Sequence, residues 1–273
     1  MSELDKFKGK GLATTSAGAG LPAKSEGVRL PWESTKPQAS KTAENILNSK
    51  RGHFAIALDG TGSMSSLIGM AKVAIKKIMS RVFVEANAPI QVQLFVYRDY
   101  DVPQLLVEQS RLSAEANELS GWLNNISATG GGGNDGEAIE QGLLSIQRAG
   151  DFDAVLLAGD EPYNSRAYLD GLGKKDLPTA ADLARRFGQS QCPIHTFLVG
   201  SCPRARKALV ELADASGGRT GQLDGSDAMI DMAVLAMLAG LKGRAFVQEY
   251  MERTPLSHSG RAFGTLLLKG PTT

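Results

Sequence analysis

The chain has 273 residues, a length that suits one domain with tails and is too short for two full enzyme domains with long linkers. Thirty Lys and Arg against 29 Asp and Glu give a net charge of +1, whereas nucleic-acid-binding domains are usually clearly basic. A hydrophobic fraction of 42% and a charged fraction of 22% are typical of a globular protein. Nucleic acid is therefore not an expected partner, and disorder throughout the chain is excluded.

The cysteine content and the apolar segments indicate where the protein works. Cys192 and Cys202 are the only cysteines, and an extended apolar run between them would hold their sulfurs beyond disulfide reach. The N-terminus lacks the apolar segment of a signal peptide. The longest apolar stretch, residues 228–241, is too short to span a bilayer and contains Asp231. We therefore expect a cytoplasmic protein that has no contact with a membrane.

Strand and helix patterns alternate along most of the chain. Residues 1–50 are rich in Gly, Ala, Ser, Thr and Lys without a sustained apolar period, which predicts a flexible N-terminal arm. After this arm, short apolar runs typical of strands alternate with apolar positions at helical spacing. Strands are predicted at residues 54–58, 90–97, 103–107, 154–158, 194–199 and 219–223, and apolar stripes that begin at residues 64, 119, 139, 180, 205 and 228 predict helices.

This order predicts one α/β domain over residues 51–242. Its sheet should be doubly wound, six-stranded and mostly parallel, with helices on both faces. The continuous apolar run at 154–158 and the similar run at 194–199 are typical of strands covered on both sides. Residues 243–273 form a C-terminal extension to which the pattern assigns no place.

Oxygen-bearing side chains follow the first predicted strand. Asp59, Thr61 and Ser63 occupy every second position of the sequence Asp-Gly-Thr-Gly-Ser-Met just before a helix. Alternate residues of an extended segment point the same way, so these side chains can converge on one point. Ligands bind at the carboxyl ends of the strands in an open α/β sheet. Oxygen ligands suit a hard cation such as Mg²⁺.

Two further loops carry candidate ligands. Thr129 and Asp135 lie in a glycine-rich loop, and Asp160 follows the strand predicted at 154–158. Helix capping is another role open to these loops, because Ser63 could instead cap the helix after the first loop, and Asn134 or Asp135 the helix after the second. A turn-forming role suits Asp160 less well, since a carboxylate that ends a buried strand needs a compensating partner.

The three loops resemble the metal-ion-dependent adhesion site of the von Willebrand factor A domain family. That site combines an Asp-x-Ser-x-Ser loop, a Thr or Asp in a second loop and an Asp in a third. Thr61 replaces one serine and keeps its hydroxyl oxygen. The resemblance covers roughly residues 52–240, and it leaves open whether Asp135, Asn134 or Thr129 supplies the second-loop ligand.

Two sequences place the resemblance closest to the branch found in α-kinase-associated and hemicentin-like proteins. They are Tyr97-Arg98-Asp99 after the second strand and the Gly-Gly-Gly-Asn-Asp run at 131–135. The first can also be an internal ion pair at a strand end, which is the interpretation we favour. The Asn at position 134 is an addition to the pattern of the branch.

The resemblance implies a Rossmann-like fold, a bound Mg²⁺ (or Mn²⁺ or Ca²⁺) and no enzymatic activity. It also implies an adaptor or scaffold whose cation captures an acidic residue of a partner protein within a multiprotein assembly, often beside an AAA+ ATPase or a kinase. The implied ligands are Asp59, Thr61, Ser63, Thr129, Asp135 and Asp160.

Three other functions fit parts of the sequence. Residues 60–65 mimic a dinucleotide-binding fingerprint, but the carboxylate of Asp59 would repel a phosphate there. A Mg²⁺-dependent phosphohydrolase with Asp59 as its nucleophile would lack its usual general acid, since position 61 is Thr. A structural subunit in which the metal only joins the loops is the third alternative.

Overall fold

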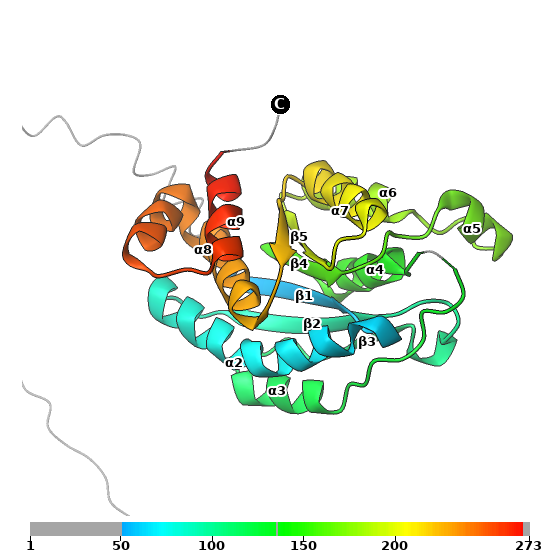
Figure 1. The fold of residues 1–273 in the computed structure, drawn as a ribbon, viewed down its shortest axis with the longest axis horizontal. Helices are drawn as coiled ribbons and strands as arrows, with labels where there is room; N and C mark the ends of the chain where they lie inside the picture. The colour runs from blue at the N-terminus through cyan, green and yellow to red at the C-terminus, as the bar shows by residue number, and fades with distance from the viewer. Residues whose placement is uncertain (1–50, 135, 270–273) are drawn as a thin grey trace, which may run out of the picture. The chain divides into compact units, whose positions relative to one another are not determined.

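The computed structural model describes residues 51–134 and 136–269, drawn in colour in Figure 1. The arm predicted over residues 1–50 and the candidate ligand Asp135 lie outside these residues.

A six-stranded sheet forms the centre of the domain. The strands are β1 (His53–Asp59), β2 (Gln91–Tyr97), β3 (Val107–Gln109), β4 (Ala154–Gly159), β5 (Ile194–Val199) and β6 (Thr220–Leu223). Their order is β3-β2-β1-β4-β5-β6, and only β3 pairs antiparallel to its neighbour. In the register of the sheet, Asp59 at the end of β1 lies beside Tyr97 at the end of β2. The predicted doubly wound, mostly parallel sheet is confirmed.

Helices cover both faces of this sheet. One face packs against α2 (Ser65–Ala86), α3 (Ala116–Asn124), α8 (Ser226–Arg253) and α9 (His258–Leu268), and the other against α4 (Ile139–Ala149), α6 (Ala180–Gln189) and α7 (Pro203–Ser216). A hydrophobic core lies on each face, and we call the one under α2, α3, α8 and α9 the first core and the other the second core. The side chains of β1 alternate between them, because Phe54, Ile56 and Leu58 lie in the first core and Ala55 and Ala57 in the second. The short helix α5 (Arg166–Gly171) follows β4.

The prediction of a strand at residues 103–107 is wrong for most of these residues. Residues Pro103–Leu105 form a turn of 3₁₀-helix, and β3 begins only at Val107. Proline lacks a backbone N–H and its fixed φ suits the first turn of a helix, which explains the difference. Val107 then pairs with Tyr97.

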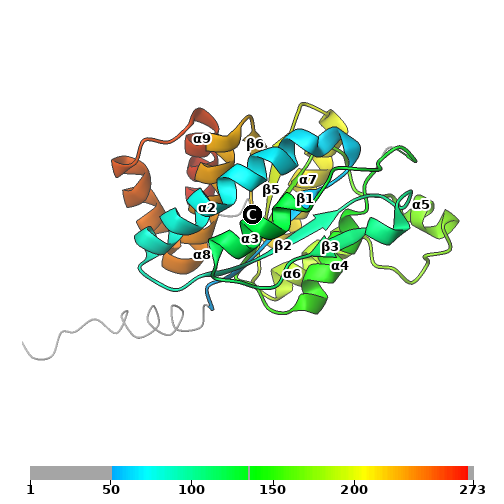
Figure 2. The ribbon, with the colours of Figure 1, turned by 90° about the horizontal axis from the view of Figure 1, so that it is seen from below.

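The C-terminal segment, to which the sequence pattern assigns no place, belongs to the first core. Helix α8 continues beyond a break at Gly243, where φ is 80° and ψ is 178°, and α9 returns against it. Val247, Tyr250 and Phe263 are fully or almost fully buried in the same core as α2. Figures 1 and 2 both show α8 and α9 at the opposite end of the domain from α5.

One buried carboxylate joins three of these helices. Asp231 of α8 accepts hydrogen bonds from Arg81 Nη1 of α2 at 3.0 Å and from the backbone N–H of Ser257, the N-cap of α9, at 2.7 Å. Its side chain is 5% exposed, whereas that of Arg81 is 45% exposed.

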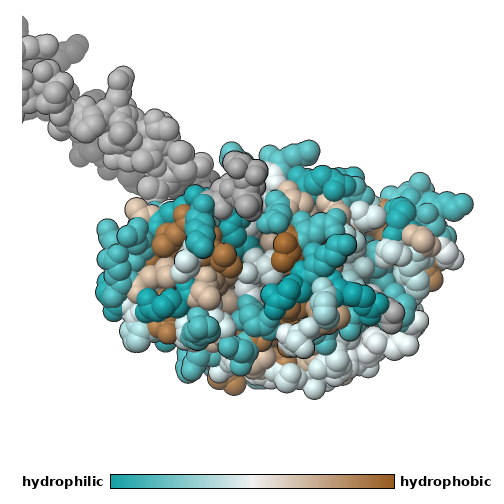
Figure 3. Space-filling view, turned by 45° about the horizontal axis from the view of Figure 1, so that its top comes forward, coloured by the Kyte–Doolittle hydropathy of each residue, from teal (hydrophilic) through white to brown (hydrophobic). Residues whose placement is uncertain are grey.

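The surface drawn in Figure 3 is mostly hydrophilic, and its hydrophobic residues gather on the side where α8 and α9 lie in Figure 1. No helix within the described residues combines the length and the apolar character needed to cross a membrane. Neither Cys192 nor Cys202 forms a disulfide within the described residues, as the sequence predicts.

Candidate metal centre

The first loop holds Asp59 in a buried position at the end of β1. Asp59 Oδ1 accepts hydrogen bonds from the backbone N–H of Thr61 at 2.8 Å and from Thr61 Oγ1 at 2.7 Å. Asp59 Oδ2 is buried and has no hydrogen-bond partner within the described residues. Gly60 makes the turn tight, since a Cβ there would lie 2.3 Å from Val96 Cγ1. The loop therefore presents one carboxylate oxygen that no donor satisfies.

The third loop brings Asp160 to the same point. Strands β1 and β4 are parallel neighbours, so their carboxyl ends lie side by side. Ser63 Oγ donates a hydrogen bond to Asp160 Oδ2 at 3.0 Å and lies 3.4 Å from Thr61 Oγ1. Asp160 Oδ1 is a second buried oxygen without a partner among the described residues. Four of the predicted ligands thus form one cluster.

The glycine-rich second loop packs against the first. The backbone N–H of Thr129 donates to the carbonyl of Gly60 at 2.9 Å, and that of Gly62 to the carbonyl of Gly130 at 2.9 Å. Gly131 has φ of +86°, and a Cβ there would lie 2.7 Å from Thr61 Cβ. The hydroxyl of Thr129 makes no hydrogen bond within the described residues, so its role as a ligand stays a prediction.

Helix capping does not account for the side chains of Ser63 and Asn134. The N-cap of α2 is Met64 and that of α4 is Ala138, and neither helix has a side-chain cap. Ser63 instead donates to Asp160, and Asn134 lies against Asn164 in the loop that follows β4.

Glu137 is a site residue that the sequence analysis missed. Its side chain is 4% exposed, and Oε2 has no hydrogen-bond partner within the described residues. Oε1 would lie 3.2 Å from a Cβ on Gly131, which places it beside Thr61. The backbone N–H of Glu137 donates to Pro162 O at 2.9 Å and thereby joins the second loop to the third. The available signal was a carboxylate between a glycine run and the apolar stripe of α4.

Within the described residues, no ion pair neutralises these acidic side chains. Burial raises the pKa of Asp59 to about 7 and that of Glu137 to about 9, and the charges of Asp59, Asp99 and Asp160 add to the shift at Glu137. In water both groups would be ionised at neutral pH. A divalent cation among them would restore the ionised forms, so the residues fit the group that the resemblance implies.

The basic side chain behind the first loop has other partners. Arg98 is 1% exposed and lies against Gly60, but its guanidinium pairs with Glu108 at 2.7 Å. It also donates to the carbonyls of Leu105 and Ser127. The internal ion pair predicted for the end of β2 is therefore present, and its partner is Glu108.

Hydroxyl oxygens are essential to any cation bound here. Within residues 51–134 and 136–269, no three His, Cys, Asp or Glu side chains are arranged to hold a metal ion by themselves. Two carboxylates, Asp59 and Asp160, would therefore share the ion with Thr61 Oγ1, Ser63 Oγ and water, a donor set that suits Mg²⁺.

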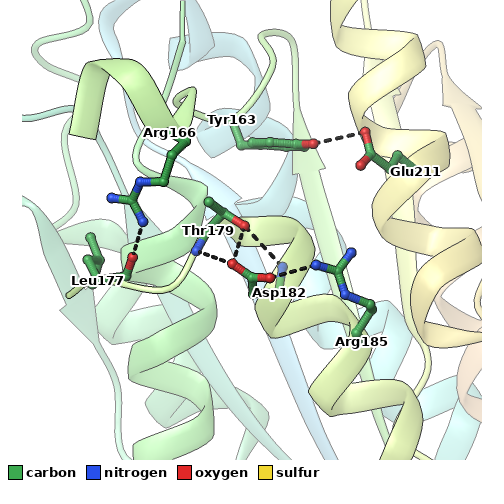
Figure 4. A network of polar contacts seen from close by, with 7 residues as sticks. All are labelled: Tyr163, Arg166, Leu177, Thr179, Asp182, Arg185 and Glu211. Carbon is green, nitrogen blue, oxygen red and sulfur yellow. Dashed lines mark hydrogen bonds and ion pairs between the residues drawn. The ribbon is translucent and has the colours of Figure 1, made fainter. Parts of the chain in front are cut away.

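Polar contacts hold the segment after Asp160, as Figure 4 shows. Tyr163 Oη donates to Glu211 of α7 at 2.8 Å, and Arg166 Nη1 donates to Leu177 O at 2.6 Å. Thr179 and Asp182 form a capping box at the start of α6. Both ends of this segment are thus fixed to helices of the second face.

Comparison with known proteins finds solved structures with a similar fold. No family model matches the sequence, and no curated protein matches it. The pilus adhesin SpaC from Lactobacillus rhamnosus GG, in its open conformation, aligns over 73% of this chain and 31% of its own with a TM-score of 0.51 and 14% identity.

Two further structures align with TM-scores just below 0.5. A von Willebrand factor type A protein from Catenulispora acidiphila gives 0.49 at 16% identity, over 70% of this chain and 43% of its own. The SpRpn10 VWA domain gives 0.48 at 13% identity, over 67% of this chain and 93% of its own. This chain therefore spans less than half of the adhesin and of the Catenulispora protein. Identities as low as that of the adhesin show the fold alone, which is a Rossmann-like α/β fold with a mostly parallel six-stranded sheet.

Proposed function

We propose that this chain is a protein-binding domain in which Asp59, Thr61, Ser63 and Asp160 hold a divalent cation that captures an acidic residue of a partner protein. The observation that carries the proposal is a pair of buried carboxylate oxygens, Asp59 Oδ2 and Asp160 Oδ1, that lie beside two hydroxyls and have no donor in the described part of the chain. Mg²⁺ is the expected ion, with Mn²⁺ and Ca²⁺ as alternatives, and no catalytic role is assigned to these residues.

The donor set leaves room for a partner. Four protein oxygens fill only part of an octahedral shell, so water occupies the rest. Ser63 is exposed while Asp59 and Thr61 are buried, which lets the outer side of the ion face solvent. A carboxylate from another protein can replace one water and form a direct ionic bond.

Three further residues are candidates for supporting roles. Glu137 lies near Thr61, its Oε2 has no hydrogen-bond partner within the described residues, and we propose that this carboxylate orients a water on the ion. Thr129 and Asp135 remain the candidate ligands of the second loop. Affinity capture would identify the assembly to which the partner belongs, such as one that contains an AAA+ ATPase or a kinase.

Affinity capture from the native cell, with Mg²⁺ or with EDTA, tests the proposal. The baits are the wild type, Asp59→Asn and the matched control Asp214→Asn, which changes an exposed carboxylate on α7. We expect a partner that the wild type and Asp214→Asn retain in Mg²⁺, that EDTA releases from both, and that Asp59→Asn does not retain. Replacing the partner's contacting Asp or Glu by its amide should also abolish capture.

The same experiment examines the structural alternative. If the wild type binds the ion but retains its partner in EDTA and with Asp59→Asn, the metal only joins the loops and the proposed capture mechanism is wrong.

A further inference from the structure

A cavity of about 480 Å³ lies at the end of the strands opposite the candidate metal centre. Asp153, Pro193 and Arg219 line it, and each immediately precedes one of the parallel strands β4, β5 and β6. The cavity is therefore at the amino ends of these strands, whereas Asp59 and Asp160 lie at carboxyl ends. The break in α8 at Gly243 also lines it.

The charged lining of this cavity is mainly basic. Arg219, Lys242 and Arg244 line it together with one carboxylate, that of Asp153. That carboxylate is already used, because its oxygens accept hydrogen bonds from the backbone N–H groups of Arg51 at 3.3 Å and residue 52 at 2.7 Å. Within the described residues, neither Lys242 nor Arg244 forms an ion pair, so the cavity has an excess of positive charge.

The guanidinium of Arg219 is fixed in position. Its Nε donates to Leu266 O at 3.1 Å and its Nη1 to Gly218 O, which leaves Nη2 without a hydrogen bond in the described part of the chain. Burial lowers the pKa of Arg219, and the nearby charge of Arg244 lowers it further, against the opposing charge of Asp214. An anion between the two guanidinium groups would relieve their repulsion.

A neutral hydrogen-bond donor adds to these cations. His195 of β5 lines the cavity and is 4% exposed. Its Nδ1 accepts a hydrogen bond from the backbone N–H of Arg219 at 3.2 Å, so the ring proton lies on Nε2. No hydrogen bond within the described residues uses Nε2. Burial lowers the pKa of His195 to about 4, which keeps the ring neutral at neutral pH.

The break in α8 contributes a helix start at the cavity. Gly243 adopts φ of 80°, a left-handed conformation that glycine reaches without strain, and a second helical segment over residues 244–253 follows it. The first N–H groups of a helix have no partner within it and favour negative charge. Gly243 and Arg244 both line the cavity, so this helix start lies beside the cationic side chains.

We propose that this cavity is a binding site for a small organic phosphate. Arg219, Lys242 and Arg244 would hold the dianionic phosphate, since guanidinium and ammonium groups form strong charge-assisted hydrogen bonds with phosphate oxygens. Pro193 and Leu267 give the lining apolar surface for the organic part, and the volume is that of a small-molecule site. The site is independent of the candidate metal centre.

Titration of the full chain with phenyl phosphate, followed by two-dimensional ¹H–¹⁵N NMR, tests this proposal. Benzoate and phenol serve as probes that lack the dianion. We expect saturable binding of phenyl phosphate in EDTA, with shifts centred on residues 194–195, 219 and 240–244, and much weaker binding of benzoate and phenol. Absent binding, shifts centred elsewhere, or benzoate binding as tight as that of phenyl phosphate would overturn the proposal.

Charge variants separate the site from general attraction by a positive surface. The double variant Lys242→Gln/Arg244→Gln should raise the dissociation constant by about tenfold or more, since it removes two charged donors. Lys207→Gln removes one charge from an exposed position of α7 and should leave the constant within about twofold. Lys242 is partly buried and Arg244 is exposed, and circular dichroism would check that the double variant folds. Equal weakening in the two variants would contradict a defined site.

Discussion

Ser63 Oγ donates a hydrogen bond to Asp160 Oδ2 across 3.0 Å and so joins two loops that are 97 positions apart in the sequence. The contact depends on the parallel pairing of β1 and β4, which brings the ends of these strands together. It places the remaining oxygen of Asp160 near the hydroxyls of the first loop without any bound ion. The protein therefore supplies a largely preformed cluster of oxygen ligands.

Asp59→Asn should stabilise the protein when metal is absent. The buried carboxylate has one oxygen without a donor, and the amide removes its charge while keeping an oxygen that can accept from Thr61. We expect the free energy of unfolding in EDTA to rise by about 2 kcal/mol, measured by chemical denaturation. Added Mg²⁺ should stabilise the wild type and leave the variant unchanged. Lower stability of the variant in EDTA would mean that the carboxylate is satisfied in the fold.

Gly159→Ala should lower the stability of the protein beside the candidate metal centre. A Cβ at this position would lie 2.7 Å from Tyr97 Oη and 3.5 Å from Asp59 Oδ2. Tyr97 Oη donates to Ala158 O and is fully buried, so it has little room to move. We expect a loss of about 1–3 kcal/mol in thermal or chemical unfolding.

Gly69→Ala is the matched control for that substitution. Gly69 lies within α2 and has open space where a Cβ would be, so alanine should raise stability by about 0.5–1 kcal/mol. If the two alanine variants showed the same change in stability, the residues around Gly159 would move more easily than the structure indicates.

His195 should make the protein less stable as the pH falls. Its pKa is lowered from 6.5 to about 4 in the fold, so the unfolded chain binds a proton first. The contribution of the neutral ring is fully present above about pH 6.5 and is lost progressively down to about pH 4, for a total of about 3 kcal/mol. His195→Asn should flatten this part of the stability profile relative to the wild type, as urea denaturation at several pH values can show.

His258→Asn provides the comparison, because His258 is exposed at the start of α9. Its profile should follow that of the wild type. A His195→Asn profile that also follows the wild type would show that the buried ring is protonated as easily in the fold as in the unfolded chain.

Asp231→Ala should separate the C-terminal helices from the rest of the core. The substitution removes the acceptor for Arg81 Nη1 and for the backbone N–H of Ser257 at the start of α9. We expect the free energy of unfolding to fall by about 2–4 kcal/mol, with hydrogen exchange increasing first in α9. Asp227→Ala, at an exposed position of α8, should change stability by less than about 1 kcal/mol. Equal effects of both variants would contradict this role for Asp231.

The sheet follows from the sequence because its signals are local. The run at 154–158 is apolar without interruption, the run at 194–199 is mostly apolar, and both lie in strands covered on both faces. The residues of the first loop are also predictable, since each lies next to the end of an apolar run. The candidate ligands that follow the ends of neighbouring strands can therefore be predicted from the sequence pattern.

Glu137 and the C-terminal helices do not emerge from local patterns. Glu137 is buried because the glycine loop folds back over Thr61, a long-range contact that requires the left-handed φ at Gly131. Helix α8 continues beyond Gly243, where a glycine would ordinarily suggest an end, because Val247 and Tyr250 pack into the core. Tertiary packing decides both features.

Binding of Mn²⁺ to the full chain, measured by electron paramagnetic resonance of the free ion, tests whether the three loops hold a cation. We expect about one equivalent of bound Mn²⁺ that Mg²⁺ displaces, lost in Asp59→Asn and in Asp160→Asn and retained in Asp214→Asn. If Mn²⁺ remains free in the presence of the wild type, or binds Asp59→Asn equally well, these three loops do not form a cation site.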